Sequence, residues 1–111
     1  MRADNLYLED ILRCIQKIES YTVGGRKSFM DTLMIQDAVA RNFEIIGEAT
    51  KRLSTSFKQA HPEVPWKKIA GLRDFLIHDY GYVDPNEVWG IIDRDLSELK
   101  ISIQSLLQTP E

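Results

Sequence analysis

Apolar residues recur every three or four positions through most of the chain, a spacing that places side chains on one face of a helix. The first such stretch runs from Asn5 to Tyr21. Its apolar positions are Leu8, Ile11, Leu12, Ile15 and Ile18. We expect Asp4 to be the N-cap of this helix, because a carboxylate accepts hydrogen bonds from free first-turn N–H groups. Gly24 and Gly25 predict the exit from the helix into a loop.

The second predicted helix is the longest and runs from about Asp31 to Ser54. It carries a seam at near-heptad spacing, formed by Ile35, Val39, Asn42, Ile46, Ala49 and Leu53. Such a seam favours either antiparallel packing within the chain or a helix-mediated dimer. Beside the seam, Glu44 and Glu48 are four residues apart, so their carboxylates repel one another unless other groups pair with them.

Two further helices complete the pattern. Pro62 and Pro65 prevent the second helix from continuing, and a third helix is predicted from Trp66 to Tyr80. Asp84-Pro85-Asn86-Glu87 is typical of a helix start, with a capping residue followed by proline at the first helical position. That fourth helix extends to about Gln108. The sequence therefore predicts one all-α domain over residues 1–111, an up-and-down four-helix bundle with room for a short extra helix.

Composition fits a small soluble protein. The chain has 111 residues and a formal net charge of −3. No run of about 18 apolar residues predicts a membrane span, and the first residues lack the apolar core of a signal peptide. We therefore expect a cytoplasmic protein with no membrane association. Cys14 is the only cysteine, which excludes an internal disulfide, and it is expected to be a packed thiol.

Charge is unevenly distributed. Residues 51–80 hold six basic and three acidic side chains, a net charge of +3, so the rest of the chain carries −6. A basic zone on an acidic protein can hold a phosphate backbone locally. On charge alone, a solvated surface is the simpler interpretation.

The segment from Arg73 to Tyr80 carries the candidate chemistry. Arginine offers a forked set of donors that matches a phosphate, and histidine transfers protons near neutral pH. His78 follows Arg73 by five residues, a rotation of roughly 140° on a straight helix. In the alternative interpretation, both residues have a structural role only. Arg73 then forms an ion pair with Asp74 or Glu44, and His78 lies at the C-terminal end of the helix.

Other kinds of site are not indicated. No histidine, cysteine or carboxylate cluster has metal-ligand spacing, and no glycine-rich phosphate loop is present, so neither a metal nor another cofactor is expected. His61, the second histidine, is expected to be an ordinary surface residue.

Arg73-x4-His78-Asp79-Tyr80 resembles the Arg-x4-His-x-Tyr signature of the HepT family, the toxin half of HepT/MntA toxin–antitoxin systems in the HEPN superfamily of helical nucleases. Two flanking segments are also similar to that family: residues 41–49 match its long helix, and residues 66–74 match the approach to its motif. The resemblance covers nearly the whole chain.

The resemblance implies a dimeric HEPN-type bundle and a metal-independent endoribonuclease, the toxin of a type VII-like toxin–antitoxin system. By this comparison Arg73 positions the scissile phosphate of an RNA substrate and His78 transfers protons. The 2′-hydroxyl of the RNA is the implied nucleophile, and a cyclic phosphate is the implied product. A homodimer also resolves the rotation between Arg73 and His78, because groups from two chains can surround one phosphate.

The resemblance also assigns supporting roles. Asn42 and Glu48 are implied to orient the motif from the second helix. Supporting or RNA-binding roles are also implied for Lys67, Lys68 and Asp79. Tyr80 is the implied acceptor of AMP from a cognate MntA-type nucleotidyltransferase antitoxin, since a phosphate beside His78 would repel RNA.

Three alternatives remain at this point. Tyr82 is a competing acceptor for AMP. The chain can also be interpreted as a non-catalytic helical partner of a minimal nucleotidyltransferase, which its acidic balance would suit. A third interpretation is a nucleotide-binding bundle in which Arg73 and the two lysines hold a phosphate.

Overall fold

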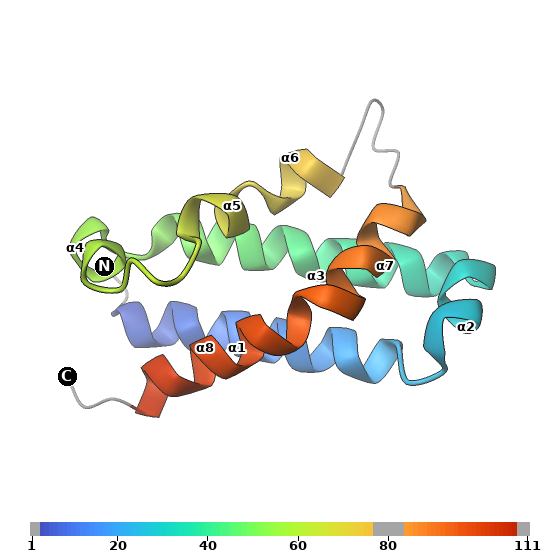
Figure 1. Ribbon diagram of the computed structural model, residues 1–111, viewed down its shortest axis with the longest axis horizontal. Coiled ribbons are helices and arrows are strands. Elements are labelled where there is room, and N and C mark those ends of the chain that lie inside the picture. The colour runs from blue at the N-terminus through green and yellow to red at the C-terminus, as the bar shows by residue number, and fades with distance from the viewer. Residues whose placement is uncertain (1–2, 77–83, 109–111) are drawn as a thin grey trace.

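The computed structural model describes residues 3–76 and 84–108, and within them every regular element is a helix (Figure 1). The elements are α1 (Asp4–Tyr21), α2 (Gly25–Asp31), α3 (Leu33–Arg52), α4 (Thr55–Ala60), α5 (Trp66–Ala70), α6 (Leu72–Leu76), α7 (Pro85–Arg94) and α8 (Leu96–Gln108). The prediction of an all-α bundle is confirmed.

The two long helices, α1 and α3, lie antiparallel and form the centre of the bundle (Figure 1). The predicted seam of α3 is buried except at Ile35, which is partly buried. Of its two interpretations, antiparallel packing within the chain is the one that this seam adopts. The core also contains Phe43, which is 1% exposed. Cys14 is buried as predicted, and burial raises the pKa of its thiol.

The prediction that Asp4 caps α1 is wrong. The N-cap is Ala3, and Asp4 is the first helical residue. Its carboxylate instead accepts two hydrogen bonds from Ser54, one from the backbone N–H and one from the hydroxyl, each at 2.8 Å. Ser54 in turn caps α4 by accepting from the backbone N–H of Phe57 at 3.2 Å. A partner 50 residues away in the sequence therefore displaced the local cap.

The predicted helices are also more broken than expected. A short helix, α2, replaces the predicted loop after α1, and Gly25 begins it with a φ of +86° that glycine adopts without strain. The third helix divides at Gly71 into α5 and α6, and the fourth divides at Asp95 into α7 and α8. The second break lets α7 pack on α2 while α8 packs on α1. The predicted cap at Asp84 is confirmed, since it accepts from the backbone N–H of Asn86 at 2.9 Å.

No helix in the described part of the chain is both long enough and apolar enough to cross a bilayer.

Candidate functional site

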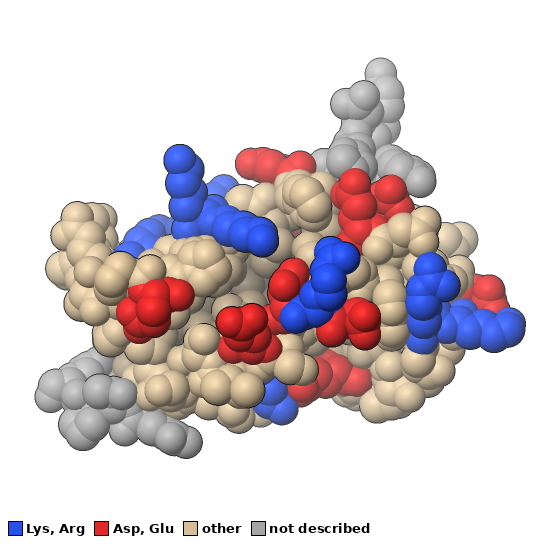
Figure 2. All heavy atoms as spheres, viewed as in Figure 1, with Lys and Arg blue, Asp and Glu red and all other residues tan. Residues whose placement is uncertain are grey.

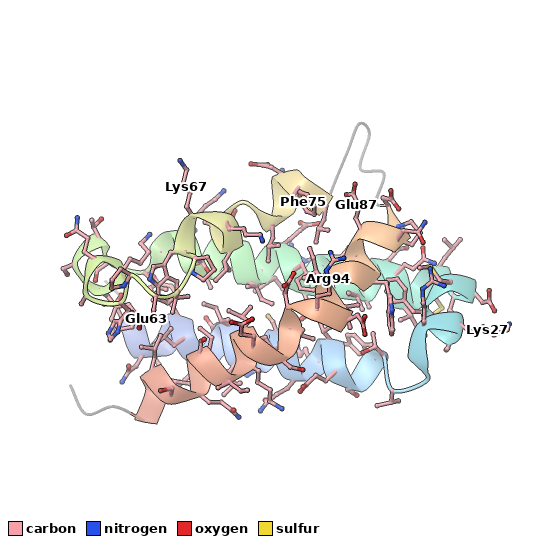
Figure 3. All side chains as sticks on the ribbon, in the orientation of Figure 1. Lys27, Glu63, Lys67, Phe75, Glu87 and Arg94 are labelled. Atoms are coloured by element: carbon pink, nitrogen blue, oxygen red, sulfur yellow. The ribbon has the colours of Figure 1, made fainter. Side chains whose placement is uncertain are left out.

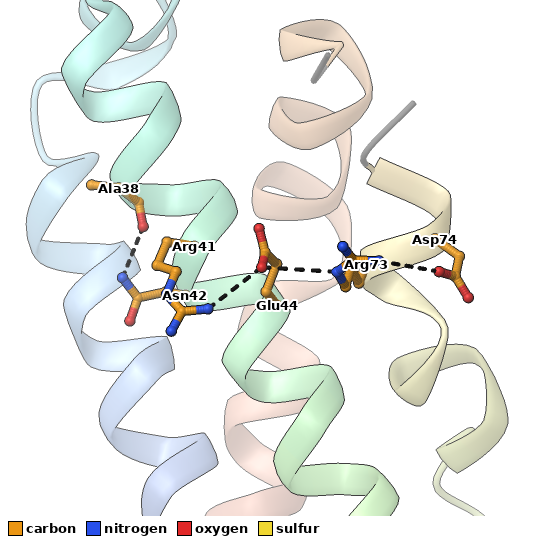
Figure 4. A network of polar contacts seen from close by, with 6 residues as sticks. All are labelled: Ala38, Arg41, Asn42, Glu44, Arg73 and Asp74. Atoms are coloured by element: carbon orange, nitrogen blue, oxygen red, sulfur yellow. Dashed lines mark hydrogen bonds and ion pairs between the residues drawn. The ribbon is translucent and has the colours of Figure 1, made fainter. Parts of the chain in front are cut away.

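Arg73 lies on α6, where its guanidinium faces α3 (Figure 4). Its Nε is 3.9 Å from the Glu44 Oε2 atom, and its Nη1 is 3.9 Å from the Asp74 Oδ1 atom. The same Glu44 oxygen lies 3.5 Å from Nη1 of Arg41. Both ion pairs of the structural alternative are therefore present, and the Glu44 carboxylate is shared between two arginines.

These ion pairs leave Arg73 available for a ligand. Its side chain is 54% exposed, and both distances exceed the range of about 2.7–2.9 Å that is typical of charge-assisted hydrogen bonds. Ion pairs between exposed side chains contribute at most about 1 kcal/mol. An incoming phosphate can therefore replace these carboxylates as the partner of the Arg73 guanidinium, while Glu44 keeps Arg41.

A backbone contact fixes where this arginine lies. At Gly47, in the middle of α3, an added Cβ would be only 3.2 Å from the carbonyl oxygen of Ala70, the last residue of α5. The missing side chain lets α3 approach α5 closely. The helix α6, which carries Arg73, begins two residues after Ala70.

Replacing Gly47 with valine is expected to lower the free energy of unfolding by about 1–3 kcal/mol, because the β-branched side chain meets a backbone carbonyl that cannot turn aside. Gly90→Val is the matched control, since the atoms nearest to a Cβ there belong to the flexible end of the Arg94 side chain. Urea denaturation of both variants measures the difference. Equal losses at the two positions would show that the approach at Gly47 is not close.

Four other predicted site residues lie in the described part of the chain, two on α5 and two on α3. Lys67 and Lys68 are exposed on α5 and form a basic group on the surface (Figure 2), with Lys67 directed into solvent (Figure 3). Glu48 is exposed on α3. Within the described residues, no hydrogen bond or ion pair joins Glu48 or Asn42 to Arg73.

Asn42 is buried in α3. Its Nδ2 donates to the carbonyl oxygen of Ala38 at 2.8 Å, and its Oδ1 has no hydrogen-bond partner among the described residues. A buried acceptor without a partner costs about 1–3 kcal/mol.

The remaining motif residues, His78, Asp79 and Tyr80, lie outside the described residues, as does Tyr82. Their catalytic, supporting and acceptor roles stay predictions.

His61 is not the ordinary surface residue that we expected. Its side chain is 29% exposed, and its ring lies 4.7 Å from the ring of Phe57. Its carbonyl oxygen accepts a hydrogen bond from the Trp66 indole at 2.9 Å. The aromatic residues on either side of it were the available signal for this packing. His61 therefore helps to close the turn before α5.

A cavity of about 380 Å³, which no pattern in the sequence indicated, lies between α5–α6 and α7–α8. Its wall is mainly apolar, and it is also lined by charged side chains that include Lys68 and Arg94; Figure 3 labels Arg94 on α7. Leu72 and Phe75 of α6 line it, whereas Arg73 contacts α3. The helix α6 thus separates an apolar cavity from the Arg73–Glu44 contact.

The chain is similar to proteins that are named as ribonucleases. A protein of Thermococcus cleftensis named "Probable ribonuclease HepT" is 41% identical over 106 residues, which cover 95% of this chain and 96% of that protein. A protein of Methanocaldococcus jannaschii named "Gamma-glutamylcyclotransferase and putative RNase" is 39% identical over 110 residues. This match covers 97% of the chain but only 50% of that protein's length.

No solved structure gives a significant match to the chain. The family model described as "Ribonuclease HepT-like" matches residues 11–106, a span that runs from within α1 into α8 and includes the whole Arg73–Tyr80 motif. The chain therefore belongs to the HepT-like ribonuclease family.

Proposed function

We propose that this protein is a metal-independent endoribonuclease in which Arg73 and His78 cleave RNA, and that it is the toxin of a toxin–antitoxin pair. The observation that carries the proposal is the state of Arg73. Its guanidinium is half exposed, forms only long ion pairs with the residues that the structure describes, and lies on the same segment as the exposed Lys67 and Lys68. Family membership supports the choice of RNA as substrate.

The chemistry follows from the groups available. The RNA 2′-oxygen forms a bond to the adjacent phosphorus as the bond from phosphorus to the 5′-oxygen breaks. The 2′-hydroxyl gives up a proton, and the leaving 5′-oxygen gains one. His78 is the candidate for these transfers, because an imidazole works as acid and as base near neutral pH. Arg73 stabilises the negative charge that grows on the phosphate oxygens.

The purified protein is expected to cleave single-stranded RNA at an unchanged rate after EDTA is added, since the proposed steps use only side chains and the RNA's own hydroxyl. The products should carry a 2′,3′-cyclic phosphate and a free 5′-hydroxyl, which mass spectrometry of a short oligonucleotide identifies. An RNA with a 2′-O-methyl group at the cleavage position is the control and should stay intact. Loss of cleavage in EDTA, or 5′-phosphate products, would contradict the mechanism.

Regulation is the second part of the proposal. A cognate nucleotidyltransferase antitoxin transfers AMP from ATP to the hydroxyl of Tyr80, which loses its proton while pyrophosphate leaves. The product carries a negative phosphate two residues from His78. Charge repulsion and bulk then exclude the RNA phosphate.

Co-expression with such a nucleotidyltransferase is expected to raise the intact mass by whole AMP units and to remove RNA cleavage. After the same co-expression, the Tyr80→Phe variant should show the mass of the unmodified chain and should cleave RNA at the full rate. Tyr82→Phe is the matched control and should still be modified. A persistent mass increase in Tyr80→Phe would assign the acceptor elsewhere.

A further inference from the structure

The cavity between α5–α6 and α7–α8 has the size and the wall of a ligand site. Its volume is about 380 Å³, and small-molecule sites typically measure about 300–1,000 Å³. Part of its wall consists of core side chains that are at most 7% exposed, namely Phe43, Ile69, Leu72 and Leu96. Contact with such a wall removes apolar surface from water, so the cavity favours a ligand with an apolar face.

Phe75 is the exposed aromatic residue of this wall. It lines the cavity from α6 (Figure 3), yet 55% of its side chain is exposed. Because the ring both lines the cavity and contacts solvent, it lies at the opening. An exposed aromatic ring in such a place can stack on a planar ligand, as the aromatic side chains of RNA-binding proteins stack on unpaired bases.

The polar groups around the cavity carry both signs of charge. Lys68 and Arg94 line it as hydrogen-bond donors, and the carboxylates of Glu63, Asp95 and Glu98 line it as acceptors. Two positive and three negative side chains give the lining a net charge of −1, which does not favour an anionic ligand. A neutral nucleobase suits the cavity better, because its faces stack on aromatic rings and its edge presents both donors and acceptors.

The cavity lies beside the group that would hold an RNA phosphate. Arg73 and Phe75 are two residues apart, a rotation of about 200° on a helix, so the guanidinium and the ring lie on opposite flanks of α6. Their side chains are 54% and 55% exposed, and Asp74 between them is also exposed. A single strand that crosses the exposed side of α6 can therefore present a phosphate to Arg73 and a nearby base to Phe75.

We propose that this cavity binds one unstacked base of a single-stranded RNA, with the Phe75 ring stacked on the base and the charged side chains of the lining bonded to its edge. The choice of RNA rests on the ribonuclease function proposed above. The site itself rests on the apolar wall, the exposed ring and the mixed charges. A base inside a duplex is paired and stacked, so this site would restrict the protein to unpaired RNA.

Binding can be measured apart from cleavage with a fluorescent oligonucleotide in which every sugar carries a 2′-O-methyl group and the proposed nucleophile is missing. Fluorescence anisotropy is expected to show that Phe75→Ala binds this RNA about 5- to 100-fold more weakly than the natural chain, the effect of losing one stacked base. Phe75→Trp keeps an aromatic face and should bind within a few-fold of the natural chain. Tyr21→Ala is the matched control, because it removes an exposed aromatic side chain that does not line the cavity, and it should also bind normally.

A second measurement couples the ring to one base. In a series of oligonucleotides that each lack a single base, one position should weaken binding to the natural chain about as much as Phe75→Ala does. The same missing base should have no further effect in Phe75→Ala, because the two changes remove one contact. The dependence of affinity on salt should stay the same, since the ring neutralises no phosphate. A damaged fold would instead weaken binding to every oligonucleotide alike.

Two results would overturn the nucleobase site. One is a Phe75→Ala variant that binds the RNA like the natural chain, which would leave the cavity to an apolar segment of a protein. The other is a series in which each missing base has the same effect in Phe75→Ala as in the natural chain.

Cleavage of unmodified RNA by the same variants keeps the two proposals apart. If the natural chain binds the methylated RNA through Phe75 but never cleaves unmodified RNA, the nucleobase site stands and the ribonuclease proposal fails. If the natural chain cleaves RNA, and Phe75→Ala binds and cleaves like it, the ribonuclease stands and the nucleobase site fails. Where both hold, the cleaved bond should lie at a fixed number of nucleotides from the base that binding requires.

Discussion

Replacing His78 with alanine is expected to reduce the rate of RNA cleavage by about 10² to 10⁴-fold, the range over which general acid–base catalysis accelerates proton transfer. The reason is that the 2′-hydroxyl and the leaving 5′-oxygen must exchange protons at neutral pH. In this chain only two side chains are histidines. A single-turnover assay with excess protein measures the chemical step apart from product release.

The matched control for that experiment is His61→Ala. The His61 ring packs against Phe57, whereas the carbonyl that accepts from Trp66 belongs to the backbone and remains in the variant. The substitution should therefore lower stability only through the lost ring contact and leave the single-turnover rate within a few-fold of the natural chain. Circular dichroism of both variants verifies that the helices remain. If His78→Ala cleaves RNA at the natural rate with its fold intact, the proposed role of His78 is wrong.

Replacing Phe43 with alanine is expected to lower the free energy of unfolding by about 3–5 kcal/mol, because the substitution leaves a hole in the core beneath α3. Phe43 is 1% exposed and belongs to the same buried cluster as Ile11, Ile15 and Ile46. Since small domains are stable by only about 5–15 kcal/mol, the loss removes a large part of the total. Chemical denaturation followed by circular dichroism measures it.

Phe75→Ala makes the same chemical change at a position that is 55% exposed. Its cost should be well below that of Phe43→Ala, because most of the ring is already in water. Equal costs at the two positions would mean that α3 does not pack as described.

The fold was predictable where one helix face decides the structure. The apolar spacing of residues 5–21 and 31–54 was enough to place α1 and α3, because both bury a continuous stripe against each other. The cap at Asp84 was also predictable, since it depends on a residue two positions away. The role of Asp4 was not predictable, because its carboxylate binds Ser54, which follows the far end of α3. Propensity alone cannot anticipate such a partner.

Part of the candidate site was also predictable from the sequence, and part of it was not. The sequence located Arg73 at the start of the motif and named Glu44 and Asp74 as its structural partners, and the structure places all three side chains together. It could not indicate that Asn42 is buried with an Oδ1 atom that has no partner among the described residues, because that depends on the rotation of α3 relative to α1. Nor could it predict the cavity beside Phe75, which requires the breaks between α5 and α6 and between α7 and α8.

The contact at Gly47 affects how this protein can change over time. Most substitutions that a core accepts exchange one apolar side chain for another of slightly different volume, and helices that meet through side chains shift in response. Here α3 meets α5 where Gly47 lies under the carbonyl of Ala70, so the spacing is set by main-chain atoms. This spacing of α3 and α5 therefore requires a residue without a side chain at position 47, whatever apolar residues fill the core around it.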